Sequence, residues 1–160
     1  MKVIVVGPRG KMGKLITQIA AARDDMELVA GVAPAGRDYI GQDLGQAAMV
    51  GRMLGVPVVD DLESVIDDCD VIIDFSTKEM GMKVLELAVA HEKALVCGTT
   101  GFSAEEMQRF KDAAQKIPML YAANTSKLVN VMNRLLEMVA STLKDEIDIE
   151  ILEMHDQWKK

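Results

Sequence analysis

The sequence has few aromatic residues and no excess of basic charge. Phe, Trp and Tyr together make up 4% of its 160 residues, which argues against surfaces that stack nucleobases or sugar rings. The formal net charge is −7, from 25 acidic and 18 basic residues. We therefore expect no general binding to nucleic acid or to an anionic membrane, while a local basic pocket for a phosphate group stays compatible with this charge.

Long apolar runs and closely spaced cysteines are also missing. The apolar run at the N-terminus is too short for a signal peptide, and no run approaches the length of a membrane span. The two cysteines, Cys69 and Cys97, lack the spacing of metal ligands, so we expect buried or idle thiols rather than a disulfide. These features predict a cytoplasmic protein with no metal site and no membrane association.

What the sequence does contain is enough apolar material for one ordinary domain. Apolar residues make up 49% of the chain, and twelve of them are methionines, which we interpret as adaptable core residues. The length suits one domain with a true core and is short for two.

Short apolar runs alternate with helical patterns along most of the chain. The expected strands are Val3 to Val6, Met26 to Val32, Val56 to Val59, Asp70 to Asp74, Ala94 to Cys97 and Pro118 to Tyr121. The expected helices include a first one with Met12, Leu15, Ile16, Ile19 and Ala20 on one stripe, then Leu62 to Ile66, Glu79 to Val89, and one that Ser103 and Glu106 open with a capping box. Residues 33–55 read as an irregular loop with a helical turn near Gly45 to Met53. This alternation predicts an α/β fold, a Rossmann-like doubly wound parallel sheet over residues 1–124.

The pattern changes from Asn124 onward. Apolar residues at helical spacing between Val129 and Leu143 predict a long amphipathic helix. Ile147, Ile149 and Ile151 then alternate with acidic residues, which is typical of a half-exposed strand in an antiparallel sheet. We interpret residues 125–160 as the beginning of an incomplete α+β substrate or oligomerisation domain, and we expect the chain to be a fragment of a longer enzyme.

The segment from Gly7 to Gly13 joins the first strand directly to the first helix. Its spacing is G-x-x-G-x-x-G rather than the commoner G-x-G-x-x-G. Glycines allow a tight turn there, and the N-terminus of the helix attracts a diphosphate. We therefore predict a dinucleotide-binding loop, with a simple tight turn as the alternative.

The acidic residue that usually follows the second strand and binds the ribose is missing. Ala33 stands in its expected place, and Asp38 comes several residues later, a distance over which it is not expected to reach the ribose. Arg37 and Lys11 could instead meet a 2′-phosphate, which favours NADPH over NADH; the alternative is that both are solvated surface cations. We leave the cofactor as NADPH or NADH.

Four further segments, together with the glycine loop, match one family in order and spacing. Ile73-Asp74-Phe75-Ser76 resembles its I-D-F-[ST] motif, and Gly98-Thr99-Thr100-Gly101-Phe102 matches its G-T-T-G-F loop. Two more are similar to its A-A/P-N-F-S and E-x-H-H-x-x-K motifs, namely Ala122-Ala123-Asn124-Thr125-Ser126 and Glu153-Met154-His155-Asp156-Gln157-Trp158-Lys159. The sequence thus resembles the N-terminal portion of the 4-hydroxy-tetrahydrodipicolinate reductase (dihydrodipicolinate reductase) family, ending before that family's D-A-P-S-G-T loop.

This resemblance implies an NAD(P)-dependent oxidoreductase of the diaminopimelate route to lysine. It also implies a homo-oligomer, a tetramer in the family, acting on a small-molecule substrate. The residues it assigns to cofactor binding are Gly7, Pro8, Arg9, Gly10, Lys11, Met12, Gly98, Thr99, Thr100, Ala122, Ala123, Asn124 and Thr125. It assigns His155 as general acid/base and Lys159 as second proton donor and anion partner.

The chemistry suits these assignments. Reduction of an unsaturated imine delivers hydride to one atom and requires a proton on its neighbour, which a histidine can supply near neutral pH. A lysine four positions later can stabilise the carboxylates of a substrate. Read without the family, His155 would be a surface imidazole.

Two departures from the family pattern leave alternatives open. Asp156 replaces the second histidine of the motif and places an acid where an anionic substrate is expected, and Thr125 replaces a phenylalanine. One alternative is a related amino-acid or amine dehydrogenase, whose cationic substrate would suit Asp156. Another is a non-catalytic nucleotide-binding module, in which Gly10→Asp abolishes cofactor binding while His155→Ala leaves the biological activity unchanged.

Overall fold

The computed structural model describes residues 1–152 and 154. The chain divides into two units, Met1–Ala123 and Asn124–Lys160. The assignment of a nucleotide-binding domain to residues 1–124 and of a substrate domain to residues 125–160 stays a prediction. His155 and Lys159, the two predicted catalytic residues, lie outside the described residues.

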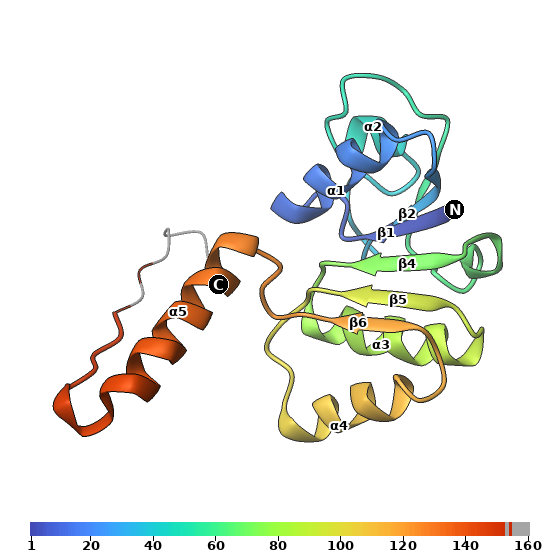
Figure 1. Cartoon of the computed structure of the whole chain (residues 1–160). Coiled ribbons are helices and arrows are strands. Elements are labelled where there is room, and N and C mark those ends of the chain that lie inside the picture. The colour runs from blue at the N-terminus through green and yellow to red at the C-terminus, as the bar shows by residue number, and fades with distance from the viewer. Residues whose placement is uncertain (153, 155–160) are drawn as a thin grey trace. The chain divides into compact units, whose positions relative to one another are not determined.

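The first unit is built on a six-stranded, fully parallel sheet of order β3-β2-β1-β4-β5-β6 (Figure 1). Its strands are β1 (Lys2–Val6), β2 (Glu27–Val32), β3 (Val58–Val59), β4 (Val71–Asp74), β5 (Ala94–Cys97) and β6 (Met119–Tyr121). The predicted doubly wound parallel sheet is confirmed. The strand order reverses direction beside β1, between β1 and β4, and ligands bind such sheets at the carboxyl ends of the strands near this point.

The helices of the first unit mostly follow the sequence pattern. They are α1 (Lys11–Ala21), α2 (Leu44–Ala47), α3 (Lys78–Ala90) and α4 (Ala104–Ala113), with a 3₁₀ turn, η1, at Ile66–Asp68. The helix predicted from Leu62 to Ile66 is instead a turn that leads into η1, and the helical turn predicted near Gly45 to Met53 is α2, which begins and ends earlier.

The capping box at the start of α4 is confirmed. The Ser103 backbone N–H donates to Glu106 Oε2 at 2.6 Å, and the Glu106 N–H donates to Ser103 Oγ at 3.2 Å. The side chain of each residue accepts a hydrogen bond from the backbone N–H of the other, so the chain enters the helix at a fixed angle.

Side chains of β1 are buried on both faces of the sheet. Ile4 and Val6 belong to a cluster that includes Val84 of α3 and Phe110 of α4. Val3 and Val5, by contrast, pack in a separate cluster that includes Ile16 of α1. Helices therefore cover both faces, which explains why this strand reads as one uninterrupted apolar run.

The first predicted helix is confirmed as α1, but its apolar stripe is only partly buried. The buried residues of α1 are Gly13, Thr17 and Ala20, whereas Leu15 and Ile19 are 52% and 62% exposed. Small residues face the sheet because the first turn of α1 lies against the preceding loop. Helical spacing identified residues that share a face but not the face that the fold covers.

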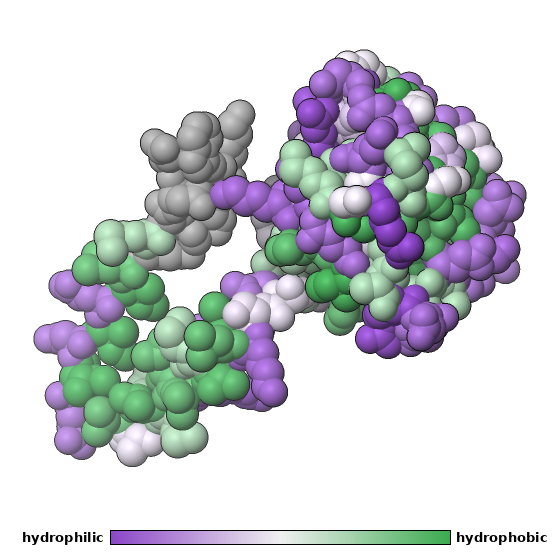
Figure 2. All heavy atoms as spheres, turned by 90° about the horizontal axis from the view of Figure 1, so that it is seen from above, coloured by the Kyte–Doolittle hydropathy of each residue, from purple (hydrophilic) through white to green (hydrophobic). Residues whose placement is uncertain are grey.

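The second unit begins with α5 (Lys127–Leu143), which Ser126 caps by accepting from the Val129 N–H at 3.4 Å, and continues into a 3₁₀ turn, η2, at Lys144–Glu146. The predicted long amphipathic helix is confirmed. None of its residues is buried, and Figure 2 shows apolar side chains gathered along it. The large ones with at least about half of their surface exposed are Leu128, Val131, Met132, Leu135, Leu136, Met138 and Val139.

The strand predicted at Ile147, Ile149 and Ile151 is not formed. Residues 147–152 have no strand assignment and no ladder partner in the part of the chain that the structure describes. A strand is stable only beside other strands that satisfy its backbone groups, and none of the described residues of the second unit offers one. The alternation of apolar and acidic residues indicates a strand but does not show whether a neighbouring strand is present to pair with it.

Candidate functional site: the carboxyl edge of the parallel sheet

The glycine loop leaves β1 through a tight turn that only glycine adopts easily. Gly7 has a φ of +76°, and its N–H donates to Val32 O of β2 at 2.8 Å. A Cβ on Gly7 would lie 2.8 Å from Phe75 O, just beyond the end of β4. Gly7 is therefore fixed between β2 and β4, at the carboxyl edge of the sheet.

Gly13 brings the first turn of α1 onto this loop. A Cβ at Gly13 would lie only 2.0 Å from Gly7 O and 2.8 Å from Pro8 Cα, so no larger residue fits without movement of the backbone. The buried Thr17 continues the same contact, since its Oγ1 donates to Gly13 O at 2.8 Å. The loop and the helix start form one closely packed turn.

The N-terminus of α1 has the properties of an anion site. Gly10 is its N-cap, no side chain caps the helix, and its first turn contains no acidic residue. The helix dipole and the backbone N–H groups at such a terminus attract a phosphate. Together with the close approach of Gly13 to Gly7, the residues present fit the diphosphate of a dinucleotide.

The other residues of the predicted loop divide into buried and exposed positions. Pro8 is buried, and its Cγ lies 3.3 Å from the position that a Cβ on Gly31 of β2 would take. Arg9, Lys11 and Met12 are exposed. Pro8 thus shapes the loop through packing, and since proline has no N–H it offers no backbone donor to a ligand.

Arg9 connects the glycine loop to the segment that follows β2. Its Nη1 lies 2.7 Å from Asp38 Oδ1, and its guanidinium carbon lies 5.0 Å from the centre of the Tyr39 ring. The chain after β2 folds back until the carboxylate of Asp38 meets the glycine loop, so Asp38 lies nearer to this loop than its place in the sequence suggests. Ala33, at the end of the strand, is fully buried.

Asp74, at the end of β4, is the fully buried acid of this edge. Its carboxylate accepts from Ser76 Oγ at 2.5 Å and from Thr99 Oγ1 at 2.9 Å, and Thr99 Oγ1 in turn accepts from the Ser76 N–H at 2.9 Å. Burial raises the pKa of Asp74, although these hydrogen bonds oppose the shift. Asp74 therefore ties the end of β4 to the loop after β5. In the sequence, Asp74 was noted as the end of an expected strand and as part of a motif, and neither showed that its carboxylate is buried.

The G-T-T segment follows β5 at the same edge. The Gly98 N–H donates to Asp74 O at 2.9 Å, and a Cβ on Gly98 would lie 2.1 Å from Phe75 Cε1. Thr99 is 5% exposed and its hydroxyl is bonded within the protein, whereas Thr100 is exposed. Of the two threonines, Thr100 is the one whose side chain is open to a ligand.

The last predicted cofactor-binding residues lie where the two units meet in sequence. Ala122 and Ala123 end the first unit, and the Ala122 N–H donates to Cys97 O of β5 at 3.1 Å. Asn124 and Thr125 belong to the second unit, where Asn124 Oδ1 accepts from the Ser126 N–H at 2.8 Å. This turn leads into α5, so the side chain of Asn124 has a local structural role.

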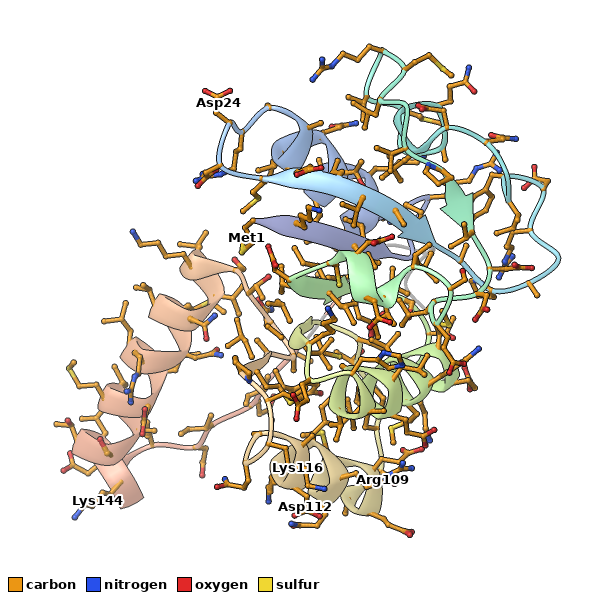
Figure 3. The ribbon with its side chains drawn as sticks, turned by 90° about the vertical axis from the view of Figure 1, so that its right-hand side faces the viewer. Met1, Asp24, Arg109, Asp112, Lys116 and Lys144 are labelled. Atoms are coloured by element: carbon orange, nitrogen blue, oxygen red, sulfur yellow. The ribbon has the colours of Figure 1, made fainter. Side chains whose placement is uncertain are left out.

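The opposite edge of the sheet is the amino-terminal one. Met1 and Asp24, both labelled in Figure 3, lie just before β1 and β2 there. A groove between α3 and α4 is lined in part by Glu86, Arg109, Asp112 and Lys116, and Arg109 pairs with Glu86. The described residues contain no group of His, Cys, Asp and Glu side chains that could hold a metal ion.

The carboxyl edge of the sheet lies within a segment that matches a known protein family. The family described as "Dihydrodipicolinate reductase, N-terminus" matches residues 1–125, a range that contains the glycine loop, Asp74 and the G-T-T segment. The chain belongs to this family. The motif resemblance found in the sequence is thereby confirmed.

Curated relatives extend the similarity over almost the whole chain. The 4-hydroxy-tetrahydrodipicolinate reductase of Hahella chejuensis is 39% identical over 159 residues, which are 99% of this chain and 59% of the relative. That of Geobacter metallireducens is 42% identical over 161 residues, again covering 59% of the relative. The chain thus spans about 59% of the length of the curated relatives it matches.

Solved structures show the same fold. A dipicolinate-bound dihydrodipicolinate reductase from Paenisporosarcina sp. TG-14 aligns with a TM-score of 0.70 and 29% identity, over 88% of this chain and 54% of that one. An amine dehydrogenase from Mycobacterium smegmatis aligns with a TM-score of 0.61 and 21% identity, over 76% of this chain and 38% of that one. The second likeness concerns the fold alone.

No helix among the residues that the structure describes has both the length and the apolar character needed to cross a membrane.

The two cysteines are free and buried, as expected. Burial raises the pKa of Cys69 to about 11 and that of Cys97 to about 12. Both thiols are therefore protonated at neutral pH and unsuited to nucleophilic or metal chemistry.

Proposed function

We propose that the first unit binds NADPH or NADH with the diphosphate on the backbone N–H groups at the start of α1. The observation that carries this proposal is the contact between Gly13 and Gly7, which leaves no room for a Cβ. An uncapped helix terminus without an acid in its first turn supports it. The G-T-T segment, at the same edge, would line the nicotinamide side of the cofactor.

The whole protein is proposed to convert 4-hydroxy-tetrahydrodipicolinate to tetrahydrodipicolinate, in the diaminopimelate route to lysine. The hydroxyl group leaves as water, and the unsaturated imine that results takes up a hydride and a proton. The names of the curated relatives support this reaction. The bound nicotinamide supplies the hydride. His155 would donate the proton, and Lys159 would hold a substrate carboxylate and serve as a second donor.

The same proposal includes a small-molecule substrate, a homo-oligomer that is a tetramer by resemblance to the family, and a cytoplasmic location. The exposed apolar side chains of α5 support association through the second unit. The net charge of −7 supports the absence of nucleic acid as a partner. Light scattering of the full-length protein measures the number of subunits.

A steady-state assay of the full-length protein tests the reaction. The substrate is supplied together with NADPH or NADH, and oxidation of the nucleotide is followed by its absorbance. We expect oxidation that depends on the substrate and that falls by a factor on the order of 10² or more in His155→Ala. If the protein oxidises neither nucleotide with this substrate, the proposed reaction is wrong.

A second candidate is a related amine or amino-acid dehydrogenase, which Asp156 favours because an acid suits a cationic substrate group. The same protein is then tested for reduction of NAD⁺ or NADP⁺ with amines and amino acids. Oxidation of an amine without reduction of the imine would select this candidate over the first.

A further inference from the structure

The cluster of Arg9, Asp38 and Tyr39 stands where the glycine loop meets the segment after β2. Arg9 pairs with Asp38 at 2.7 Å and lies over the Tyr39 ring. Tyr39 is 8% exposed, and Gln42 Nε2 donates to Asp38 O at 3.0 Å. The carbonyl of Asp38 is therefore hydrogen-bonded and the residue after it is buried, and its carboxylate pairs with Arg9 of the loop although 78% of its side chain is exposed.

Dinucleotide-binding domains recognise the adenosine ribose on this side of the glycine loop. An acid there accepts hydrogen bonds from the ribose hydroxyls of NADH, whereas a basic residue accommodates the 2′-phosphate of NADPH. The position directly after β2 is Ala33, which is fully buried and has no polar side chain. Asp38 is the acid that the fold brings to the loop in its place.

We propose that Asp38, positioned by Arg9, selects NADH over NADPH at the adenosine ribose. This inference rests on the proposed binding of a nicotinamide dinucleotide at the glycine loop. It opposes the preference for NADPH that the nearby cations Arg37 and Lys11 suggest in the sequence, because the contacts of Arg9 and Asp38 were not visible there.

The charges of the cluster give the reason. A phosphate monoester carries a charge of about −1.5 to −2 at neutral pH, and it would have to enter beside the carboxylate of Asp38. The guanidinium of Arg9 already pairs with this carboxylate and lies over Tyr39. Ribose hydroxyls meet no such repulsion, since they donate to the carboxylate directly.

Calorimetric titration of the chain with NADH and with NADPH, each alone, tests the proposal on wild type and on Asp38→Asn. The asparagine keeps the size of the side chain and removes its charge. We expect wild type to bind NADH more tightly, and Asp38→Asn to lower the ratio of Kd(NADPH) to Kd(NADH) about tenfold, the size of one charge-assisted hydrogen bond.

Asp25→Asn is the matched control. Asp25 is also an exposed aspartate paired with an arginine, Arg23, at 2.6 Å, but it precedes β2 at the amino-terminal edge of the sheet. We expect this variant to keep the ratio of wild type. Thermal melting checks that both variants are folded.

The possible results separate this inference from the function on which it rests. If wild type binds both nucleotides but prefers NADPH, or if Asp38→Asn leaves the ratio unchanged, the role of Asp38 is refuted while cofactor binding stands. If the folded wild type binds neither nucleotide, the proposed function fails, and the selection by Asp38 fails with it.

Discussion

Replacement of Gly13 by alanine tests the packing on which the site depends. Gly13 lies in the first turn of α1, and the added methyl group would point at the backbone of the loop that precedes the helix. It would lie 2.0 Å from Gly7 O and 2.8 Å from Pro8 Cα. Both contacts are to backbone, so rotation of a flexible side chain cannot relieve them.

Two effects of opposite sign set the magnitude. Alanine is favoured over glycine inside a helix by about 1 kcal/mol. Insertion of a methyl group into a filled space costs typically about 1–3 kcal/mol, and the upper end applies because ordinary contact begins near 3.4 Å. We expect a net loss of about 2 kcal/mol in the free energy of unfolding, or roughly 4–8 °C in Tm for a chain of this size.

The matched control is Gly10→Ala, three positions earlier. Gly10 has a φ of −67°, which any residue adopts, and a Cβ there would meet only Gly7 O, at 3.3 Å. Thermal and urea unfolding compare the two variants, and calorimetry with NADH compares their affinity. A Gly13→Ala protein as stable as wild type, or no less stable than Gly10→Ala, would refute the inferred packing of loop and helix.

Three further predictions concern ionisable groups. Burial raises the pKa of Asp74, so this carboxyl favours the folded state below its unfolded pKa, near 4, and loses that contribution as pH rises through the folded pKa. In urea unfolding over a pH series, the free energy of unfolding of Asp74→Asn should therefore rise relative to that of wild type as pH increases. A difference between the two proteins that stays constant with pH contradicts this. Since Cys69 and Cys97 are buried with raised pKa values, a thiol reagent should label them only after unfolding, and rapid labelling of the native protein would be inconsistent with the structure. Burial raises the pKa of Asp43, but hydrogen bonds from four backbone N–H groups outweigh this effect and lower the pKa. Asp43→Ala should therefore reduce the free energy of unfolding by about 1–3 kcal/mol at pH values above the unfolded pKa of Asp43. The loss should become smaller as pH falls through the folded pKa, a dependence that urea unfolding at several pH values measures.

Local patterns in the sequence predicted most of the first unit. Val3 to Val6 read as a buried strand because a strand covered on both faces has no reason to alternate. The pair Ser103 and Glu106 predicted a helix start because the capping box involves only neighbouring residues. In each case the information lies within a few positions of the element it defines.

Features that depend on distant contacts were missed. Helical spacing placed Leu15 and Ile19 on one stripe, but the closeness of Gly13 to the glycine loop turns small residues toward the sheet. The reach of Asp38 depends on how the loop after β2 folds, which its composition does not specify. The burial of Asp74 requires Ser76 and Thr99 to converge on it from two strand ends.

The proposed nucleotide-binding loop and the proposed proton donor lie in different units of the chain. Gly7, Gly13, Asp38 and Asp74 all lie within Met1–Ala123, and every contact described among them stays inside that unit. The proposed proton donor, His155, belongs to the other unit. Under the proposed function, affinity for the nucleotide depends on the packing of the sheet edge, whereas turnover also requires His155, so the two properties should respond to different substitutions.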